Sequence, residues 1–299
     1  MSGMNHPSQL ESVYLSRNRR ECRHRSLVLN AAGVNHHVHH RAGEFALLVA
    51  PEDSARARAE LAAYASENPA SLPSPKRVPP MANGWIGVIG YTAVLIVLDY
   101  LQRTHHFGLN WYQLGETNAA KMKDGQWWRT VTALTLHADL PHLMGNLVIG
   151  GLFGLFVGQT LGSGLGWLAI LVAGVAGNFL NAMIRQPGYT SIGASTAVFA
   201  ALGILAGTTW THRRRTSART LARWTPLIGG AILLGYLGTG GERTDVGAHI
   251  FGFLVGLILG VTLDRAGSHL ALSIRSQLVL GAVALAILVV AWSLAIGNA

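Results

Sequence analysis

The chain has 299 residues, of which 50% are hydrophobic and only 12% carry a charge. The charged residues crowd into roughly the first 80 positions and into short stretches between long apolar segments, as is typical of a polytopic membrane protein. The formal net charge is +9, but no aromatic-interleaved basic patch accompanies it, so a nucleic-acid partner is not expected. A single cysteine, Cys22, excludes an intramolecular disulfide.

The first 68 residues are polar and predict a small cytoplasmic α/β module. Residues 26–34 and 44–50 have strand-like composition, and residues 51–68 read as a helix with acidic residues near its start. A proline-rich linker over residues 69–84 is expected to end the module.

A histidine cluster, NHHVHH, occupies residues 35–40 of this module. Imidazoles are common metal ligands, so a metal site is one interpretation. Strand alternation would place His37 and His39 on one face and His36 and His40 on the other, which leaves only two ligands per face. A solvated polar connector is therefore the favoured interpretation, and no metal is expected.

From Trp85 onward the hydropathy changes, and seven membrane spans are predicted. The first six form an all-α bundle within residues 85–264, and residues 265–299 hold a connector and one extra C-terminal helix. A long loop, residues 103–140, separates the first two spans. The predicted spans are 85–102, 141–161, 164–184, 191–210, 225–240, 245–263 and 277–295.

The distribution of basic residues predicts the orientation, because Lys and Arg concentrate on the cytoplasmic side. Basic residues precede the first span, separate the fourth from the fifth and follow the sixth, all on one side of the bilayer if the N-terminus is cytoplasmic. The long loop and the end of the fourth span that bears Ser195 would then face outward.

Polar groups inside apolar spans indicate a functional site because they are expensive to place in hydrocarbon. The sixth span carries His249, three residues before the first of three glycines at four-residue spacing, Gly252, Gly256 and Gly260. Such spacing lets another helix approach to near backbone contact, and the Gly- and Ala-rich fourth span is the expected partner. This packing would bring the Ser195 hydroxyl within hydrogen-bond reach of the His249 imidazole, as in an activated nucleophile.

Donors for an oxyanion are available beside this pair. His142 and Asn146 are four residues apart on the second span and share a helical face. If the fourth helix begins near Ser195, the N–H groups of its first turn lack intrahelical acceptors and its dipole favours negative charge there. The alternatives are that His142 and Asn146 only hold helices together and that Ser195 bonds its own backbone.

Several motifs follow one another along residues 85–264. They are Trp128-Arg129, the spaced set His137, His142 and Asn146, the triplet Gly193-Ala194-Ser195, and Gly247-Ala248-His249 with Gly252 and Gly256. In this order they resemble the motifs of the rhomboid intramembrane serine proteases. Thr196 stands where the family usually continues with glycine, and Phe199 stands where many relatives have tyrosine.

The resemblance implies a Ser195–His249 dyad without an obligatory carboxylate and without a cofactor. It also implies an oxyanion hole formed by His142, Asn146 and the Ser195 amide, and a structural role for the loop with Trp128 and Arg129. Substrates would be transmembrane proteins, cut at or near the outer face of the bilayer, and the expected location is a bacterial inner membrane. A non-proteolytic relative that binds transmembrane clients for quality control is the alternative.

Supporting roles are expected for further residues near the dyad. His137 precedes the second helix and would support the loop, and the Phe199 ring could stack on His249. Asp245 lies four residues before His249 and is interpreted as the cap of the sixth helix rather than a third catalytic group. Oligomeric state is left open.

Overall fold

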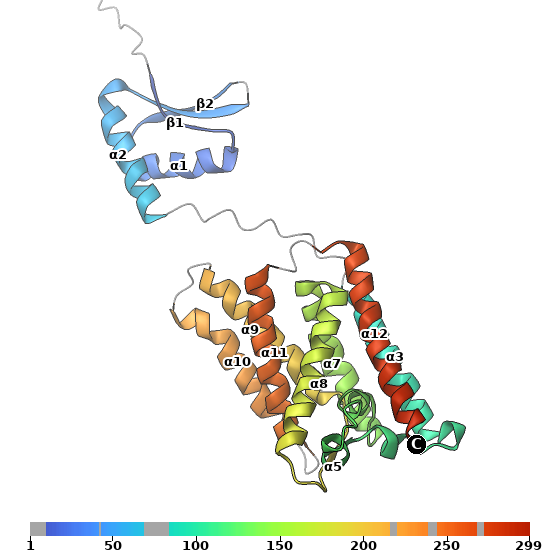
Figure 1. Cartoon of the computed structure of the whole chain (residues 1–299). Coiled ribbons are helices and arrows are strands. Elements are labelled where there is room, and N and C mark those ends of the chain that lie inside the picture. Colours follow the sequence, from blue (N-terminus) through green and yellow to red (C-terminus); the bar gives the residue numbers. More distant parts are fainter. Residues whose placement is uncertain (1–9, 42, 69–83, 216–219, 239–243, 268–271) are drawn as a thin grey trace, which may run out of the picture. The chain divides into compact units, whose positions relative to one another are not determined.

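The computed structural model describes residues 10–41, 43–68, 84–215, 220–238, 244–267 and 272–299 (Figure 1). The chain divides into two compact units, Met1–Lys76 and Arg77–Ala299. The predicted linker lies outside the described residues, apart from Gly84.

The N-terminal unit is a three-stranded antiparallel sheet with two helices. Its strand order is β1-β3-β2, and Leu47 and Val49 of β3 are fully buried against Leu29 of α1. The elements in chain order are β1 (Glu11–Ser16), α1 (Arg19–Ala31), β2 (His36–Arg41), β3 (Glu44–Val49) and α2 (Pro51–Glu67).

The predictions for β3 and α2 are confirmed, whereas the strand predicted over residues 26–34 is wrong. Most of that segment belongs to α1, which begins after Asn18, whose side chain accepts hydrogen bonds from Arg20 N and Glu21 N. This N-cap satisfies otherwise unpaired donors and starts the helix upstream of the apolar run. The apolar composition alone resembled a strand.

The histidine cluster forms strand β2, so the prediction of a connector is also wrong. Along the strand, His36 Nε2 lies 2.7 Å from Ser26 Oγ, and the His40 ring stacks on Phe45 with centroids 4.3 Å apart. The side chains of His36 and His40 are thus engaged in contacts within the module, and the backbone of the strand pairs with β3. Within the described ranges, no three His, Cys, Asp or Glu side chains come together to hold a metal ion.

The second unit is a bundle of long helices joined by a structured loop (Figure 1). The long helices are α3 (Trp85–Arg103), α7 (Leu140–Leu161), α8 (Ser163–Ile184), α9 (Ser195–Arg215), α10 (Thr220–Gly238), α11 (Val246–Ala266) and α12 (Ile274–Gly297). The loop between α3 and α7 contains η1 (His106–Gly108), α4 (Trp111–Gly115), β4 (Thr117–Asn118), α5 (Ala119–Lys123), α6 (Arg129–Thr132) and η2 (Ala133–Thr135), and β4 pairs with β5 (Thr190–Ser191).

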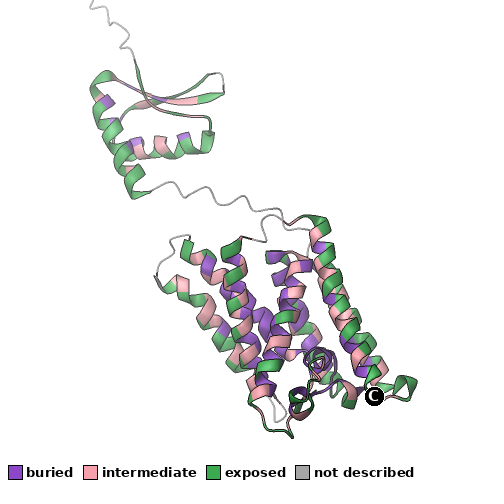
Figure 2. Ribbon diagram, viewed as in Figure 1, coloured by how far each residue is buried: buried purple, intermediate pink, exposed green. Residues whose placement is uncertain are grey.

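Five of these helices, α3, α7, α8, α11 and α12, are long and apolar enough to cross a membrane. Helix α10 contributes a shorter apolar stretch, Leu221–Leu237, and its residues lie toward one side of the bundle. Helix α9 ends in three arginines and is mostly buried by its neighbours, so its environment is protein rather than lipid (Figure 2). The arrangement is that of an integral, multi-pass membrane protein.

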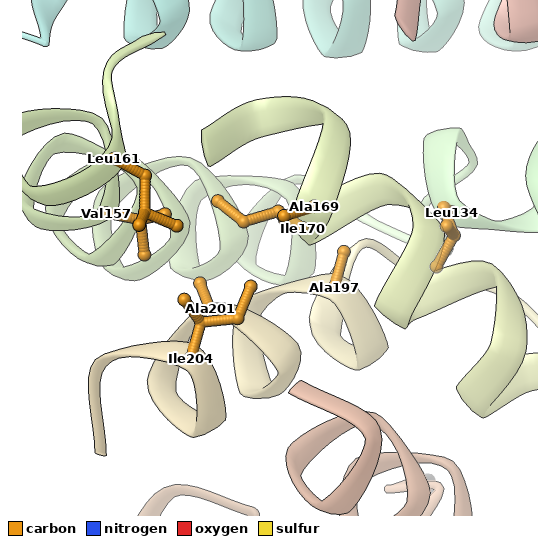
Figure 3. Packing of buried hydrophobic residues seen from close by; sticks show 8 residues of the cluster. All are labelled: Leu134, Val157, Leu161, Ala169, Ile170, Ala197, Ala201 and Ile204. Atoms are coloured by element: carbon orange, nitrogen blue, oxygen red, sulfur yellow. The ribbon is translucent and has the colours of Figure 1, made fainter. Parts of the chain in front are cut away.

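Apolar residues from several helices close the centre of the bundle around α9. Ala197, Ala201 and Ile204 of α9 meet α7 and α8 in one buried cluster (Figure 3). The remaining members of the cluster are Leu134, Val157, Leu161, Ala169 and Ile170. Helix α9 is thereby held in place on the side facing α7 and α8.

On its other side, α9 runs parallel to α11 at near backbone contact. A Cβ atom added to Gly252, Gly256 or Gly260 would collide with a carbonyl oxygen of α9, that of Thr196, Ala200 or Ile204 respectively. Gly203 and Gly207 of α9 face carbonyl oxygens of α11 in the same way. The predicted pairing of the fourth and sixth spans is therefore confirmed. Only glycine permits two helices to approach each other this closely.

Helix α12 is attached to the bundle near both of its ends. Close to its start, the buried Gln277 accepts a hydrogen bond from Leu165 N at 2.9 Å and donates to Leu161 O at 3.0 Å, which ties it to the turn between α7 and α8. Near its end, Trp292 Nε1 donates to Thr135 Oγ1 at 3.2 Å, and its ring packs on Trp111.

The glycine contact predicts a large difference between two chemically identical substitutions. Gly256→Ala should destabilise the bundle by about 1–3 kcal/mol, because the new methyl group must push α11 away from Ala200 O. Gly229→Ala in α10 is the matched control, since a Cβ there meets nothing within 4 Å, and should be neutral or stabilising by up to about 1 kcal/mol. Unfolding titrations in mixed micelles measure both, and equal effects would contradict this account of the contact.

Candidate active site

The serine and histidine singled out from the sequence lie next to each other. Ser195 is the first residue of α9, and His249 lies in the first turn of α11. Because these helices run parallel, their N-termini are at the same end of the bundle. His249 Nε2 lies 2.8 Å from Ser195 Oγ, and the imidazole is buried with 5% exposure.

The turn before α9 brings His142 against the serine. Gly193 has φ of 130°, a conformation that side chains other than glycine rarely adopt, and its N–H donates to Ala133 O at 2.9 Å. A Cβ at Gly193 would sit 2.8 Å from His142 Cε1 and Nε2 and 3.6 Å from Ser195 Oγ. Glycine is therefore required both by the backbone and by the close approach of the His142 ring.

Asn146 lies one helical turn beyond His142 on α7 and is buried. Its Nδ2 donates to His142 O at 3.1 Å, and a primary amide retains a second N–H for another acceptor. Tyr91 of α3 donates its hydroxyl to Asn146 O at 2.8 Å. Asp139 begins α7 by accepting from His142 N at 2.8 Å, which fixes the turn that carries His142.

The two positions that differ from the usual rhomboid pattern fit their surroundings. The Phe199 ring contacts the His249 ring, with centroids 4.5 Å apart and ring planes tilted by 36°, so the expected ring contact is made without a phenol, although the rings are not stacked. Thr196 is buried, and its methyl group faces Gly177 and Gly252, neither of which has a side chain to oppose it. The larger residue at position 196 is accommodated by these two glycines.

His137 is fully buried beside the serine turn. Its Nε2 lies 3.5 Å from Ala194 N, and its ring meets the His142 ring edge-on at 5.1 Å. The Gln102 side chain pairs with both backbone groups of His137, donating to the carbonyl at 2.8 Å and accepting from the N–H at 3.3 Å. Burial is the main cause that lowers the pKa of His137 to about 3, so this imidazole is neutral.

Asp245 caps α11 as predicted, because its side chain accepts from Ala248 N. It also joins a cluster that sequence reasoning missed, accepting from Asn181 Nδ2 at 3.1 Å, from Arg185 at 3.5 Å and from the Tyr189 hydroxyl. Burial and this hydrogen bond raise the pKa of Tyr189, which keeps its proton as a donor. The cluster fixes the first turn of α11, and hence His249, against the end of α8.

Polar residues within a predicted membrane span could have revealed that such a cluster exists. Asn178 and Asn181 are polar residues in the predicted third span, where such groups usually have a partner. In the structure Asn178 donates to Thr130 O at 3.0 Å, and Asn181 binds Asp245. The partners themselves could not be chosen from the sequence, because Thr130 and Asp245 are 48 and 64 residues away.

Arg129 is buried in the loop and connects three of its segments. Its guanidinium donates to Gln126 Oε1 at 2.7 Å and to the carbonyl oxygens of Gln113 and Glu116, both at 3.0 Å. Burial lowers the pKa of Arg129 and raises that of Glu116. Trp128, next to it, packs into the cluster that contains Trp292. These contacts lie in the loop rather than at the dyad.

The fold and the site together define a multi-pass helical membrane protein with a hydrogen-bonded serine and histidine at one end of the bundle. Comparison with known protein families adds a match to the rhomboid domain over residues 124–266, which includes both residues. Residues 124–266 are thus identified as a rhomboid domain.

Individual relatives come from distant organisms. The chain is 32% identical over 149 residues to the Rhomboid-like protease 3 of Toxoplasma gondii, covering 49% of this chain and 55% of the relative. It is 29% identical over 157 residues to RHOMBOID-like protein 5 of Arabidopsis thaliana, covering 50% and 48%. It is 31% identical over 158 residues to the Rhomboid protease GluP of Bacillus subtilis, covering 52% and 30%. The chain thus spans about half the length of the first two relatives and less of the third.

The buried, neutral His137 predicts a pH dependence of stability. Its folded pKa of about 3 lies below the ordinary value of 6.5, so the unfolded chain binds more protons between these values. The contribution of His137 to the free energy of unfolding is therefore fully present above pH 6.5. It falls as the pH drops from 6.5 toward 3, by roughly 1 kcal/mol per pH unit. The His137→Phe variant lacks the imidazole, so its free energy of unfolding should change less with pH than that of the wild type between pH 4 and 6.5. Equal pH dependence in the two proteins would contradict this role of His137.

Proposed function

We propose that this protein is an intramembrane serine endopeptidase that cleaves transmembrane segments of other membrane proteins with a Ser195–His249 dyad. The observation that carries the proposal is the 2.8 Å separation of His249 Nε2 and Ser195 Oγ. A serine hydroxyl is a weak nucleophile unless a base within hydrogen-bond reach can take its proton. The names of the relatives as proteases point to the same class.

In the proposed reaction, His249 Nε2 accepts the proton of Ser195 Oγ as the oxygen attacks the carbonyl carbon of the substrate. The same proton then passes to the leaving amine, and the acyl-enzyme forms. A water molecule, activated by His249, hydrolyses this ester and returns the serine. Ser195 and His142 are both partly exposed, which is the access that such a water would need.

The negative oxygen of the tetrahedral species would be stabilised by donors from two helices. The first-turn N–H groups of α9, including that of Ser195, point away from the helix and carry its positive dipole end. His142 Nε2 lies against Gly193 beside the serine, and Asn146 offers its second N–H. Removing one such donor typically costs 10²- to 10³-fold in rate.

The location and orientation belong to the proposal. The basic residues after the fourth and sixth spans support a cytoplasmic N-terminus, which would put the dyad near the opposite face of the membrane. The proposed membrane is a bacterial inner membrane. A relative that only binds transmembrane clients would have no use for a buried imidazole paired to a serine. The enzyme is therefore favoured over that alternative.

Reconstitution with a model transmembrane substrate tests the proposal. Ser195→Ala and His249→Ala should each lower cleavage by at least about 10³-fold, because they remove the nucleophile and its base. His106→Ala, at an exposed histidine in η1, is the control and should cleave normally. Cleavage that persists in Ser195→Ala would overturn the dyad.

A serine-directed fluorophosphonate separates the enzyme from a client-binding protein without a substrate. The wild-type protein should label at Ser195, and Ser195→Ala should not. His249→Ala should label far more slowly, because the hydroxyl has lost its base. A folded wild-type protein that never labels would favour the client-binding alternative.

A further inference from the structure

A cavity of about 530 Å³ lies between α3, α8 and α12, away from the contact of α9 with α11. Gly90 and Val94 line it from α3, Trp167 from α8, and Gly281 and Leu288 from α12. Nearly all of its surface is apolar. Water would find few hydrogen-bond partners there, so a polar occupant is disfavoured.

The attachment of α12 explains why this space stays open. Gln277 and Trp292 fix the helix near its two ends, about 22 Å apart at 1.5 Å per residue. Between them, a Cβ added to Gly281 would meet only the Gly164 Cα, at 3.8 Å, so α12 is loosely packed at this position. The cavity is thus a long slot beneath a helix that is tied at both ends.

Two occupants are available in a membrane, a transmembrane helix and a hydrocarbon chain. A helix would need a space about 10 Å wide along its whole length. A single hydrocarbon chain is slender enough to fit. The outer faces of α3 and α12 carry exposed residues such as Ile89 and Val279, so acyl chains already surround the slot.

One end of the slot offers a place for a charged headgroup. Ile274, Gln277 and Ser163 line this end. Arg275 does not line the cavity, but it is exposed and follows Ile274 in the first turn of α12. A guanidinium is complementary to a phosphate. We propose that the slot binds one acyl chain of an anionic phospholipid whose phosphate lies at Arg275, in the leaflet opposite Ser195.

The bound chain would pack against residues that hold the candidate active site. The far end of the slot is lined by Ala194, next to Ser195, and by Thr135, which binds Trp292. Tyr91, whose hydroxyl donates to Asn146 O, lines its middle together with Trp167. An occupied slot would restrict the movement of α3 and of the turn before α9.

Photolabelling in vesicles tests the proposal. The inactive Ser195→Ala protein is placed in phosphatidylcholine vesicles that contain a trace of phosphatidylglycerol with a diazirine midway along one acyl chain. After irradiation, adducts should concentrate on slot-lining peptides of α3, α8 and α12. Because no proteolysis is measured, this result is independent of the proposed function.

Two pairs of variants make the test specific. Gly90→Phe fills the slot from α3, where a Cβ meets nothing within 4 Å, and Gly281→Phe fills it from α12. Each should lower slot labelling at least fivefold, whereas Ile89→Phe and Val279→Phe, on the exposed faces next to them, should not. The use of two slot variants guards against one that fails to fold.

Three results would overturn the proposal. The first is equal labelling of the slot variants and their controls. The second is labelling spread evenly over all lipid-exposed faces. The third is labelling of the slot by a diazirine-bearing transmembrane peptide rather than by the phospholipid, which would make the slot a site for protein segments.

Discussion

The near backbone contact between α9 and α11 is the constraint on which the site depends. No side chain separates the two helices where Gly252, Gly256 and Gly260 face the carbonyl oxygens of α9. Because the helices are parallel, a fixed separation along their length also fixes the distance between their first turns. A hydroxyl on one first turn and an imidazole on the other then meet, provided that each helix begins at the right residue.

Different devices set those two starting points. The beginning of α9 is fixed by the conformation of Gly193 and its hydrogen bond to Ala133 O, and that of α11 by the cluster around Asp245. Both devices use groups from the connecting segments, which are held in turn by Arg129 and by the pairing of β4 with β5. The structured loop is therefore part of what positions the site.

The dyad could be predicted from the sequence because its determinants are local. A four-residue glycine spacing specifies a helix contact wherever it occurs, and His249 lies at a fixed offset from Gly252. The segment 26–34 has the composition of a strand, but the helix that contains most of it begins at the Asn18 cap, which lies outside this apolar run. Contacts such as Gln277 with Leu161 O or Trp292 with Thr135 join residues more than 110 positions apart, and no local pattern encodes them.

Helix α12 shows how an added element can affect a site that it does not contribute to. Its Trp292 binds Thr135 in η2, and the same short helix contains Ala133, whose carbonyl holds Gly193. A displacement of α12 would thus reach the serine turn through two consecutive hydrogen bonds. Because side-chain hydrogen bonds tie α12 near its two ends, whatever fills the slot beneath it would affect how far the middle of the helix can move. The lipid environment and the geometry of the nucleophile are in this way physically connected.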